Sequence, residues 1–393
     1  MGSYLNRVIA ILNSSTFTYL ASLLMPTLAF KCGTVRNIPV PDLSRFGALD
    51  SIANKLIGIA KERWDASERS WDFNGFDLTC CGTSSSLISK LVGERKETLL
   101  HQETKYRELE LQNDQIASEA YGLDGLDSGE DESTEPVSND DILSEFIREL
   151  VSYAVGCMFG RYALDKPGLI LANQGETIED YLKRVPEPSF PADDDNVIPM
   201  LDGDWFTDDI AERFRKFLRV AFGDEHYEDN LRFVEQGLNI KGKRNYGIRD
   251  YFLGEFYTDH VKRYKKRPIY WLFSSPKGSF NALIYMHRYR PDTVSVVLND
   301  YLREFRTKLT SHKNHLEAVS ISGSASQGEK TKALKEIEKI TKMIAEMEEY
   351  EREVLYPLAT EQVEIDLDDG VKVNYPKLGA ALKKIVGLDA KED

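Results

Sequence analysis

The chain has 393 residues, which is enough for two or three domains that each have a hydrophobic core. Hydrophobic residues make up 41% and charged residues 29% of the chain, which is the composition of an ordinary soluble protein. The formal net charge of −15 argues against nucleic acid as a partner of the whole surface. Local patches of positive charge can still bind a polyanion, because binding depends on the local charge of a surface and not on the net charge of the chain.

The N-terminal part predicts helices. Apolar residues recur at helical spacing over 4–24, and further helices are expected from about 43 to 69 and from 97 to 121, giving a helical spacer over 46–123. A short strand pair is expected between the first two helical regions. The longest apolar run, Tyr19 to Met25, is too short to span a membrane, and no convincing cleavage site follows it. We therefore expect a cytoplasmic chain with no membrane partner.

An acidic segment marks the clearest internal boundary. Residues 124–141 contain eight acidic residues and no basic one, which predicts a disordered linker. Ser138 to Asp141 then predict a capping box for a helix that carries Ile142 and Met158. Residues 164–206 are rich in proline and aspartate and predict loops, and a helix from near Thr207 is expected to end at Gly223.

A β-hairpin is predicted in the stretch RPIYWLFSSPKGSFNALIYMHRYRP, residues 267–291. The segments Ile269–Phe273 and Phe280–Tyr285 have the length and the aromatic and β-branched content of strands. Pro276 and Gly278 between them favour a tight turn. We place this hairpin in a mixed α/β domain that covers 142–292.

A run of cations precedes the hairpin and is the strongest binding signal in the sequence. Nine cations lie within 27 residues: Lys241, Lys243, Arg244, Arg249, Lys262, Arg263, Lys265, Lys266 and Arg267. Six aromatic residues are interleaved with them, and Lys277 at the hairpin tip is a tenth candidate. Cations with aromatic residues are what contact with nucleic-acid phosphates, sugars and bases requires. The alternative is a solvated basic face that balances an acidic segment such as 124–141.

The C-terminal part predicts a long antiparallel helical hairpin over 293–356, because apolar residues between 333 and 347 alternate spacings of four and three. A tail over 357–393 is expected to contain short strands, EIDL and VKVNY, and a helix. The predicted fold class is therefore mostly α with small β elements. It combines the helical spacer, a mixed α/β region with the β-hairpin, and the helical hairpin.

The chain lacks the usual catalytic signatures. It contains no GxxxxGK[ST], no GxGxxG after a strand, no HExxH and no GxSxG. Cys32, Cys80, Cys81 and Cys157 form no CxxC pair, so neither a zinc site nor a disulfide framework is predicted. The six histidines are scattered. We therefore predict no catalytic residue and no metal ligand.

Several longer blocks carry a family resemblance. The chain resembles the C-terminal part of the PglX family in KKRPIYWLFSSPKGSFNALIYMHRYRPDTVSVVLNDYLREF, ELVSYAVGCMFGRYALDKPGLI and DLDDGVKVNYPKL. This family comprises the adenine-specific DNA methyltransferases of type 1 BREX phage-exclusion systems, and related blocks occur in type IIG and IIL restriction–modification enzymes. Residues 1–45 look like the end of the target-recognition region in that group.

The resemblance implies a function and also limits it. It implies double-stranded DNA as a partner, and S-adenosylmethionine as the cofactor with which the full-length family methylates adenine N6. The chain contains neither the glycine-containing cofactor motif nor the Asn-Pro-Pro-Tyr motif of the family. We therefore expect no cofactor in this chain and no activity of the chain alone. One alternative is a docking platform, whose partner is another BREX protein, a separate methyltransferase half or a phage-encoded inhibitor. The other alternative is a structural spacer without a ligand.

Overall fold

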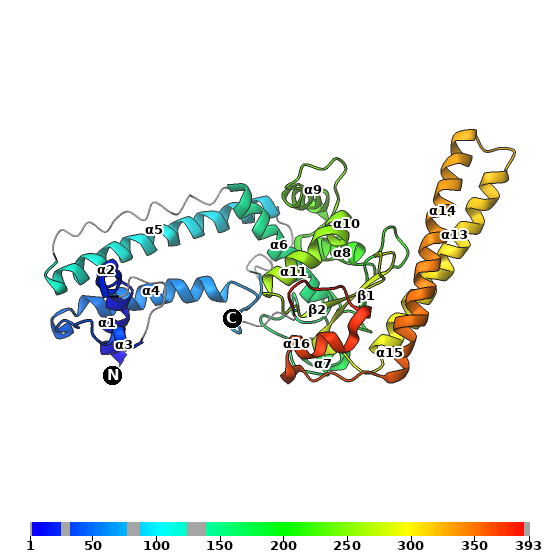
Figure 1. Ribbon diagram of the computed structural model, residues 1–393. Coiled ribbons are helices and arrows are strands. Elements are labelled where there is room, and N and C mark those ends of the chain that lie inside the picture. The colour runs from blue at the N-terminus through cyan, green and yellow to red at the C-terminus, as the bar shows by residue number, and fades with distance from the viewer. Residues whose placement is uncertain (1, 25–31, 77–86, 124–138, 389–393) are drawn as a thin grey trace. The chain divides into compact units, whose positions relative to one another are not determined.

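The computed structural model describes residues 2–24, 32–76, 87–123 and 139–388. The described chain is mostly helical with one small antiparallel sheet, which confirms the predicted fold class (Figure 1). It divides into two compact units, Met1–Phe73 with Ser89–Leu143 and Asn74–Ile88 with Ser144–Asp393. Each unit contains its own cluster of buried apolar side chains.

The first unit is a small helical core. Its main helices are α1 (Gly2–Leu12), α2 (Ser15–Leu24), α3 (Cys32–Val35), α4 (Ala48–Asp65) and α5 (Ile88–Tyr121). Ile11, Phe17 and Leu49 are buried among these helices. Of the strand pair expected after residue 24, residues 25–31 lie outside the described residues, and Cys32–Val35 is helical instead of extended.

The first two helices are rich in apolar residues. No single helix in the described part of the chain is long and apolar enough to cross a membrane. Helices α1 and α2 together meet that criterion by length and composition only, as a pair bent by 64°. Ile11, Phe17 and Ala21 on these helices are buried in the core of the first unit.

The predicted acidic linker lies largely outside the described residues, which omit 124–138. Its last three residues belong to α6 (Asn139–Met158). Ile147, Leu150 and Val151 on one side of this helix are buried, which accounts for the helical spacing of its apolar residues.

The second unit is built on a three-stranded antiparallel sheet with the strand order β1-β3-β2. Strands β2 (Tyr270–Ser274) and β3 (Asn281–Tyr285) form the predicted hairpin, with Trp271 opposite Ile284. The third strand, β1 (Val197–Pro199), pairs with the other edge of β3. It lies in a segment that the sequence predicted to be loop, because three residues that end in proline carry almost no strand signal. Strand β2 is left at the edge of the sheet.

Helices surround the sheet and continue into the predicted helical hairpin. The helices are α7 (Ile178–Arg184), α8 (Ile210–Phe222), α9 (Tyr227–Leu238), α10 (Ile248–Tyr251), α11 (Tyr257–Arg263), α12 (Thr293–Val296), α13 (Arg303–Ile321), α14 (Gln327–Tyr350), α15 (Tyr356–Glu361) and α16 (Val371–Asn374). A π-helical turn, Phe252–Phe256, joins α10 to α11. Helices α13 and α14 lie side by side as a long pair (Figure 1). Their apolar seam joins the sheet core through Phe305 and Met347.

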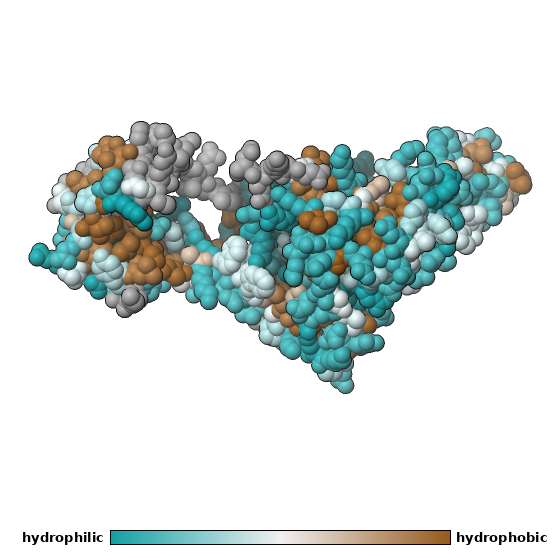
Figure 2. All heavy atoms as spheres, turned by 60° about the horizontal axis from the view of Figure 1, so that its bottom comes forward, coloured by the Kyte–Doolittle hydropathy of each residue, from teal (hydrophilic) through white to brown (hydrophobic). Residues whose placement is uncertain are grey.

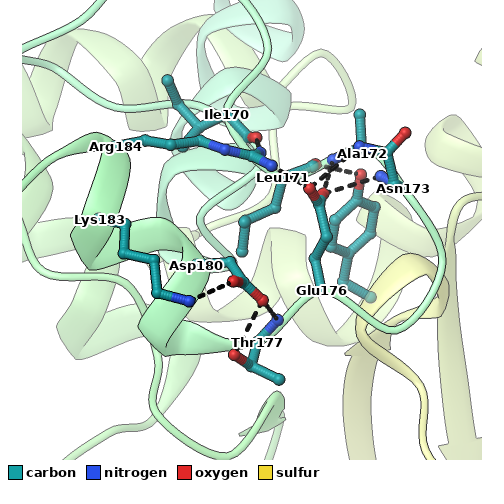
Figure 3. Close-up of polar contacts among 10 residues, drawn as sticks. Ile170, Leu171, Ala172, Asn173, Glu176, Thr177, Asp180, Lys183 and Arg184 are labelled. Atoms are coloured by element: carbon teal, nitrogen blue, oxygen red, sulfur yellow. Dashed lines mark hydrogen bonds and ion pairs between the residues drawn. The ribbon is translucent and has the colours of Figure 1, made fainter.

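The segment between α6 and β1 is more ordered than its composition suggested. The carboxylate of Glu176 accepts hydrogen bonds from the backbone N–H groups of Ala172 and Asn173, at 2.7 and 2.8 Å, and pairs with Arg184 of α7 (Figure 3). Burial alone would raise the pKa of Glu176, but the Asn173 N–H and the Arg184 guanidinium hold it below its ordinary value. All of these bonds are local, so we assign Glu176 to holding this loop.

The C-terminal tail contains helical turns where strands were expected. Asp366 accepts a hydrogen bond from the Asp368 N–H at 3.0 Å, and the side chain of Asn374 bonds to the backbone of Asp366 and Gly370. These side chains close short turns, which outcompete the strands that the alternation of EIDL and VKVNY predicted. Farther along, Leu382 forms an isolated bridge with Phe273, and the Lys383 N–H donates to the Leu272 carbonyl at 2.8 Å. The tail therefore covers the free edge of β2.

Candidate nucleic-acid interface

The ten predicted cations do not form one surface, because several are used inside the fold. The clearest case is Arg249, whose guanidinium contacts Asp209 at 2.9 Å and Asp204 at 2.5 Å and also donates to the Leu201 carbonyl. The Asp209 side chain is only 2% exposed, and it caps α8 by accepting from the Ala211 N–H. Burial raises the pKa of Asp209 despite the opposing effect of Arg249. Arg249 thus neutralises a buried carboxylate.

Three more cations are paired with carboxylates. Lys241 and Lys243 lie 3.7 and 3.1 Å from Glu255, and Arg263 lies 3.3 Å from Glu145. The Arg263 side chain is 13% exposed. Arg244 and Arg267 lie on the surface. Lys241, Lys243, Arg244, Arg263 and Arg267 remain predicted phosphate contacts. Three of these five, like Arg249, contact a carboxylate in the fold.

Four of the six aromatic residues between the cations belong to the core. Tyr251, Tyr257, Tyr270 and Trp271 are buried, and the Tyr257 hydroxyl lies 2.9 Å from the Tyr375 hydroxyl. Buried rings do not stack on bases, so the interpretation fails for these four residues, whereas Tyr246 and Tyr264 are only partly buried. A sequence shows aromatic residues near cations equally well for a buried strand and for an exposed stacking surface.

The remaining lysines meet around a hollow of about 680 Å³ in the second unit. Six lysines line it: Lys262, Lys265, Lys266, Lys277, Lys383 and Lys384. We call this set the lysine rim. None of the described residues that line the hollow is acidic, and none of the six ammonium groups lies within 4.0 Å of a carboxylate of a described residue. The hollow therefore concentrates positive charge without internal neutralisation, which favours a polyanion.

The end of α11 places the lysines at 262–266. The Lys265 N–H donates to the Lys262 carbonyl at 3.0 Å, and the Lys266 N–H reaches back to the Val261 carbonyl at 2.8 Å. Lys265 and Lys266 have φ values of 49° and 64°, in the left-handed region that glycine usually occupies at the end of a helix. Left-handed backbone costs a lysine roughly 1–2 kcal/mol per residue. The fold holds both residues there, and both line the hollow.

The turn between β2 and β3 places Lys277. Its backbone N–H donates to the carboxylate of Glu346 on α14 at 2.7 Å, and the Ser279 hydroxyl donates to the same carboxylate at 2.5 Å. Burial alone would raise the pKa of Glu346, but the hydroxyls of Ser275 and Ser279 and the Lys277 N–H lower it below its ordinary value. Helix α14 thereby fixes the turn that carries one lysine of the rim.

Replacing Glu346 with glutamine is expected to lower the free energy of unfolding at pH 7 by about 2 kcal/mol, because charge-assisted bonds to the turn are lost. The folded pKa of Glu346 is lowered, so its stabilisation is present above the ordinary glutamate pKa and is lost as the pH falls through the folded pKa. Urea unfolding should therefore show a difference between wild type and Glu346→Gln that shrinks toward acid. Glu348→Gln, at an exposed position two residues farther along the same helix, should change stability by less than about 0.5 kcal/mol at either pH. A difference that stayed constant down to acid pH would contradict this role of the carboxylate.

Two lysines of the rim were missed by the sequence analysis. Lys383 and Lys384 reach the hollow because the tail pairs with the edge of β2, more than 100 residues away in sequence. The sequence shows only a Lys-Lys pair before Ile385. The Lys266 side chain also reaches the tail, because a Cβ built on Gly387 would lie only 2.6 Å from the Lys266 Nζ.

The lining favours some ligands and disfavours others. S-adenosylmethionine carries a sulfonium cation, which the lysine rim would repel, so the hollow does not fit the cofactor that the resemblance implies for the full-length family. Across the described residues, no three His, Cys, Asp or Glu side chains gather as metal ligands would. The arrangement suits phosphate groups, which ammonium groups bind as point charges.

Comparison with known proteins gives two close matches. The adenine-specific methyltransferase BrxX of Escherichia coli O9:H4 (strain HS) is 33% identical over 409 residues, covering 97% of this chain and 33% of that protein. The adenine-specific methyltransferase PglX of Lacticaseibacillus casei (strain Zhang) is 31% identical over 397 residues, covering 97% of this chain and 32% of that protein. No family model matches the chain. The chain spans about a third of the length of these curated relatives.

Proposed function

The chain is PglX/BrxX-like in sequence over nearly its whole length, and from this we propose that it serves as a DNA-contacting C-terminal portion of an adenine-specific DNA methyltransferase in phage defence. The single observation that carries the proposal is the lysine rim, whose six lysines line a hollow in which no described lining residue is acidic. DNA phosphates would displace condensed counterions by binding there. Such contacts position a duplex without reading its sequence.

Methyl transfer is not assigned to this chain. The cofactor and Asn-Pro-Pro-Tyr motifs are missing from its sequence, and the lysine-rimmed hollow disfavours a cationic cofactor. We assign the chemistry to the portion of the relatives that this chain does not match. The role proposed here is to hold the duplex for that portion.

Amine-reactive labelling tests the proposal. The full chain is acetylated under limiting reagent with and without a duplex, and each lysine is quantified by mass spectrometry. We expect protection of Lys262, Lys265, Lys266 and Lys277, with no protection of Lys332, Lys335 and Lys342 on α14. Uniform labelling of both groups in the presence of saturating duplex would contradict the proposed surface.

A docking role is the second candidate, because the first unit exposes large apolar side chains. Tyr4, Leu5 and Leu23 on α1 and α2 are each about 60% exposed, and Figure 2 shows apolar side chains gathered over this unit. Such patches are typical of protein–protein contacts. A chain that fails to bind duplex DNA but co-purifies with another defence protein would favour this candidate.

A further inference from the structure

The hollow has a feature that contact with a paired duplex does not require. A duplex presents its phosphates on a convex surface, and cations spread over a surface are enough to bind them. Here the lysines surround a recess of about 680 Å³, which lies within the usual range for sites that enclose a small molecule or a single chemical group.

The wall of the recess is apolar. It is formed largely by Met200, Phe252, Leu253, Val261, Leu272 and Ile385. Four of these side chains are less than 9% exposed and belong to the core, so the wall is fixed by packing: Met200, Phe252, Leu272 and Ile385. Thr258 and Asn281 supply neutral polar groups beside it. An anion with no apolar body would leave this wall in contact with water.

We infer that the hollow binds an unpaired nucleotide, with its base against the apolar wall and its phosphates on the lysine rim. The inference rests on the proposed function and makes its ligand more specific. Thr258 and Asn281 line the hollow with neutral polar side chains that suit base edges, and the lysines supply positive charge for the phosphates on either side of the base. An unpaired nucleotide within a DNA strand and a free nucleoside polyphosphate share this chemistry.

Gly254 allows the recess to be filled without a change of charge. It lines the hollow within the π-helical turn Phe252–Phe256, and a Cβ built on it meets nothing within 4 Å. Gly254→Phe therefore adds a ring at the recess without a clash at the point of attachment. Gly328→Phe is the matched control, because a Cβ there meets only the Ser326 hydroxyl at 4.0 Å. Gly328 lies on α14, 18 residues before Glu346, which is about 27 Å along a helix.

The test measures fluorescence anisotropy of the full chain with three duplexes of one sequence: fully paired, with a single bulged adenosine, and with a bulged abasic residue. The bulged adenosine should bind roughly tenfold more tightly than the paired duplex, as expected for one enclosed base, and the abasic bulge should lose that gain. Gly254→Phe should abolish the gain of the bulged adenosine over the paired duplex, whereas Gly328→Phe should preserve it.

Competition with ATP separates the two sources. ATP that displaces the bulged duplex from wild type, but not from Gly254→Phe, identifies a free nucleotide as a ligand; failure to compete at millimolar ATP assigns the hollow to a DNA strand. Equal affinity of wild type for all three duplexes would overturn the inference and leave the proposed function standing. No binding to any of the three duplexes would overturn both.

Discussion

Replacing Lys262, Lys265 and Lys266 together with glutamine is expected to weaken binding of duplex DNA roughly a hundredfold at 0.15 M salt. Each phosphate contact contributes about 0.9 to the slope of log affinity against log salt, so three contacts are worth about two logarithmic units at that salt concentration. The loss should be the same for every duplex sequence, because phosphate contacts carry no base information. Glutamine keeps much of the side-chain length and carries about the same cost at the two left-handed positions.

A second triple variant controls for the change in net charge. Lys332, Lys335 and Lys342 are exposed on α14, away from the hollow lining, and their replacement with glutamine removes the same three charges. We expect less than about a threefold change in affinity from this variant, because unlocalised charge is screened at 0.15 M salt. Equal losses from the two variants, with both proteins folded by circular dichroism, would mean that overall charge and not the lysine rim governs binding.

Arg249→Ala is expected to destabilise the fold by about 3 kcal/mol. The substitution leaves the carboxylate of Asp209 buried without its cation, which typically costs about 3–5 kcal/mol, and protonation of the carboxyl limits the loss to the lower end. Burial already raises the pKa of Asp209, and removing Arg249 should raise it further. A group with a raised folded pKa loses stability as the pH rises through that pKa, so the deficit of the variant should grow with pH.

Chemical unfolding at several pH values checks this result, with Arg244→Ala as the control. Arg244 lies on the surface, so its replacement should change stability by less than about 0.5 kcal/mol. Arg249→Ala that unfolds like wild type but binds DNA weakly would show that Arg249 is a phosphate contact. The outcome separates a structural arginine from a binding one within the same basic run.

The local elements of the fold were predictable from the sequence. Alternation of spacings identified the pair α13 and α14, and aromatic and β-branched runs around Pro276 and Gly278 identified β2 and β3. Elements that depend on distant partners were not predictable. Strand β1 has only three residues and forms by pairing with the edge of β3. The turns of the tail depend on side-chain hydrogen bonds around Asp366 and Asn374, which cannot be predicted from the alternation of apolar and polar residues.

The candidate site was predictable only in part. The run 241–267 and Lys277 contain four of the six lysines of the rim. Charge density could not distinguish them from Arg249 and Arg263, whose carboxylate partners lie 40 and 118 residues away in sequence. It also could not locate Lys383 and Lys384, because their position depends on the tail crossing the edge of β2. Pairing of charges across the fold, which decides which cations remain available, is a tertiary property.

The dependence of duplex affinity on salt tests the central claim most directly. The slope of log affinity against log salt is measured for wild type and for the variant with glutamine at 262, 265 and 266, over a range of salt concentrations in which both proteins stay folded. The lysine rim predicts a slope that is shallower in the variant by about 2.7, which corresponds to three lost phosphate contacts. Identical slopes for the two folded proteins would contradict it, because the three lysines would then make no contact with the DNA backbone.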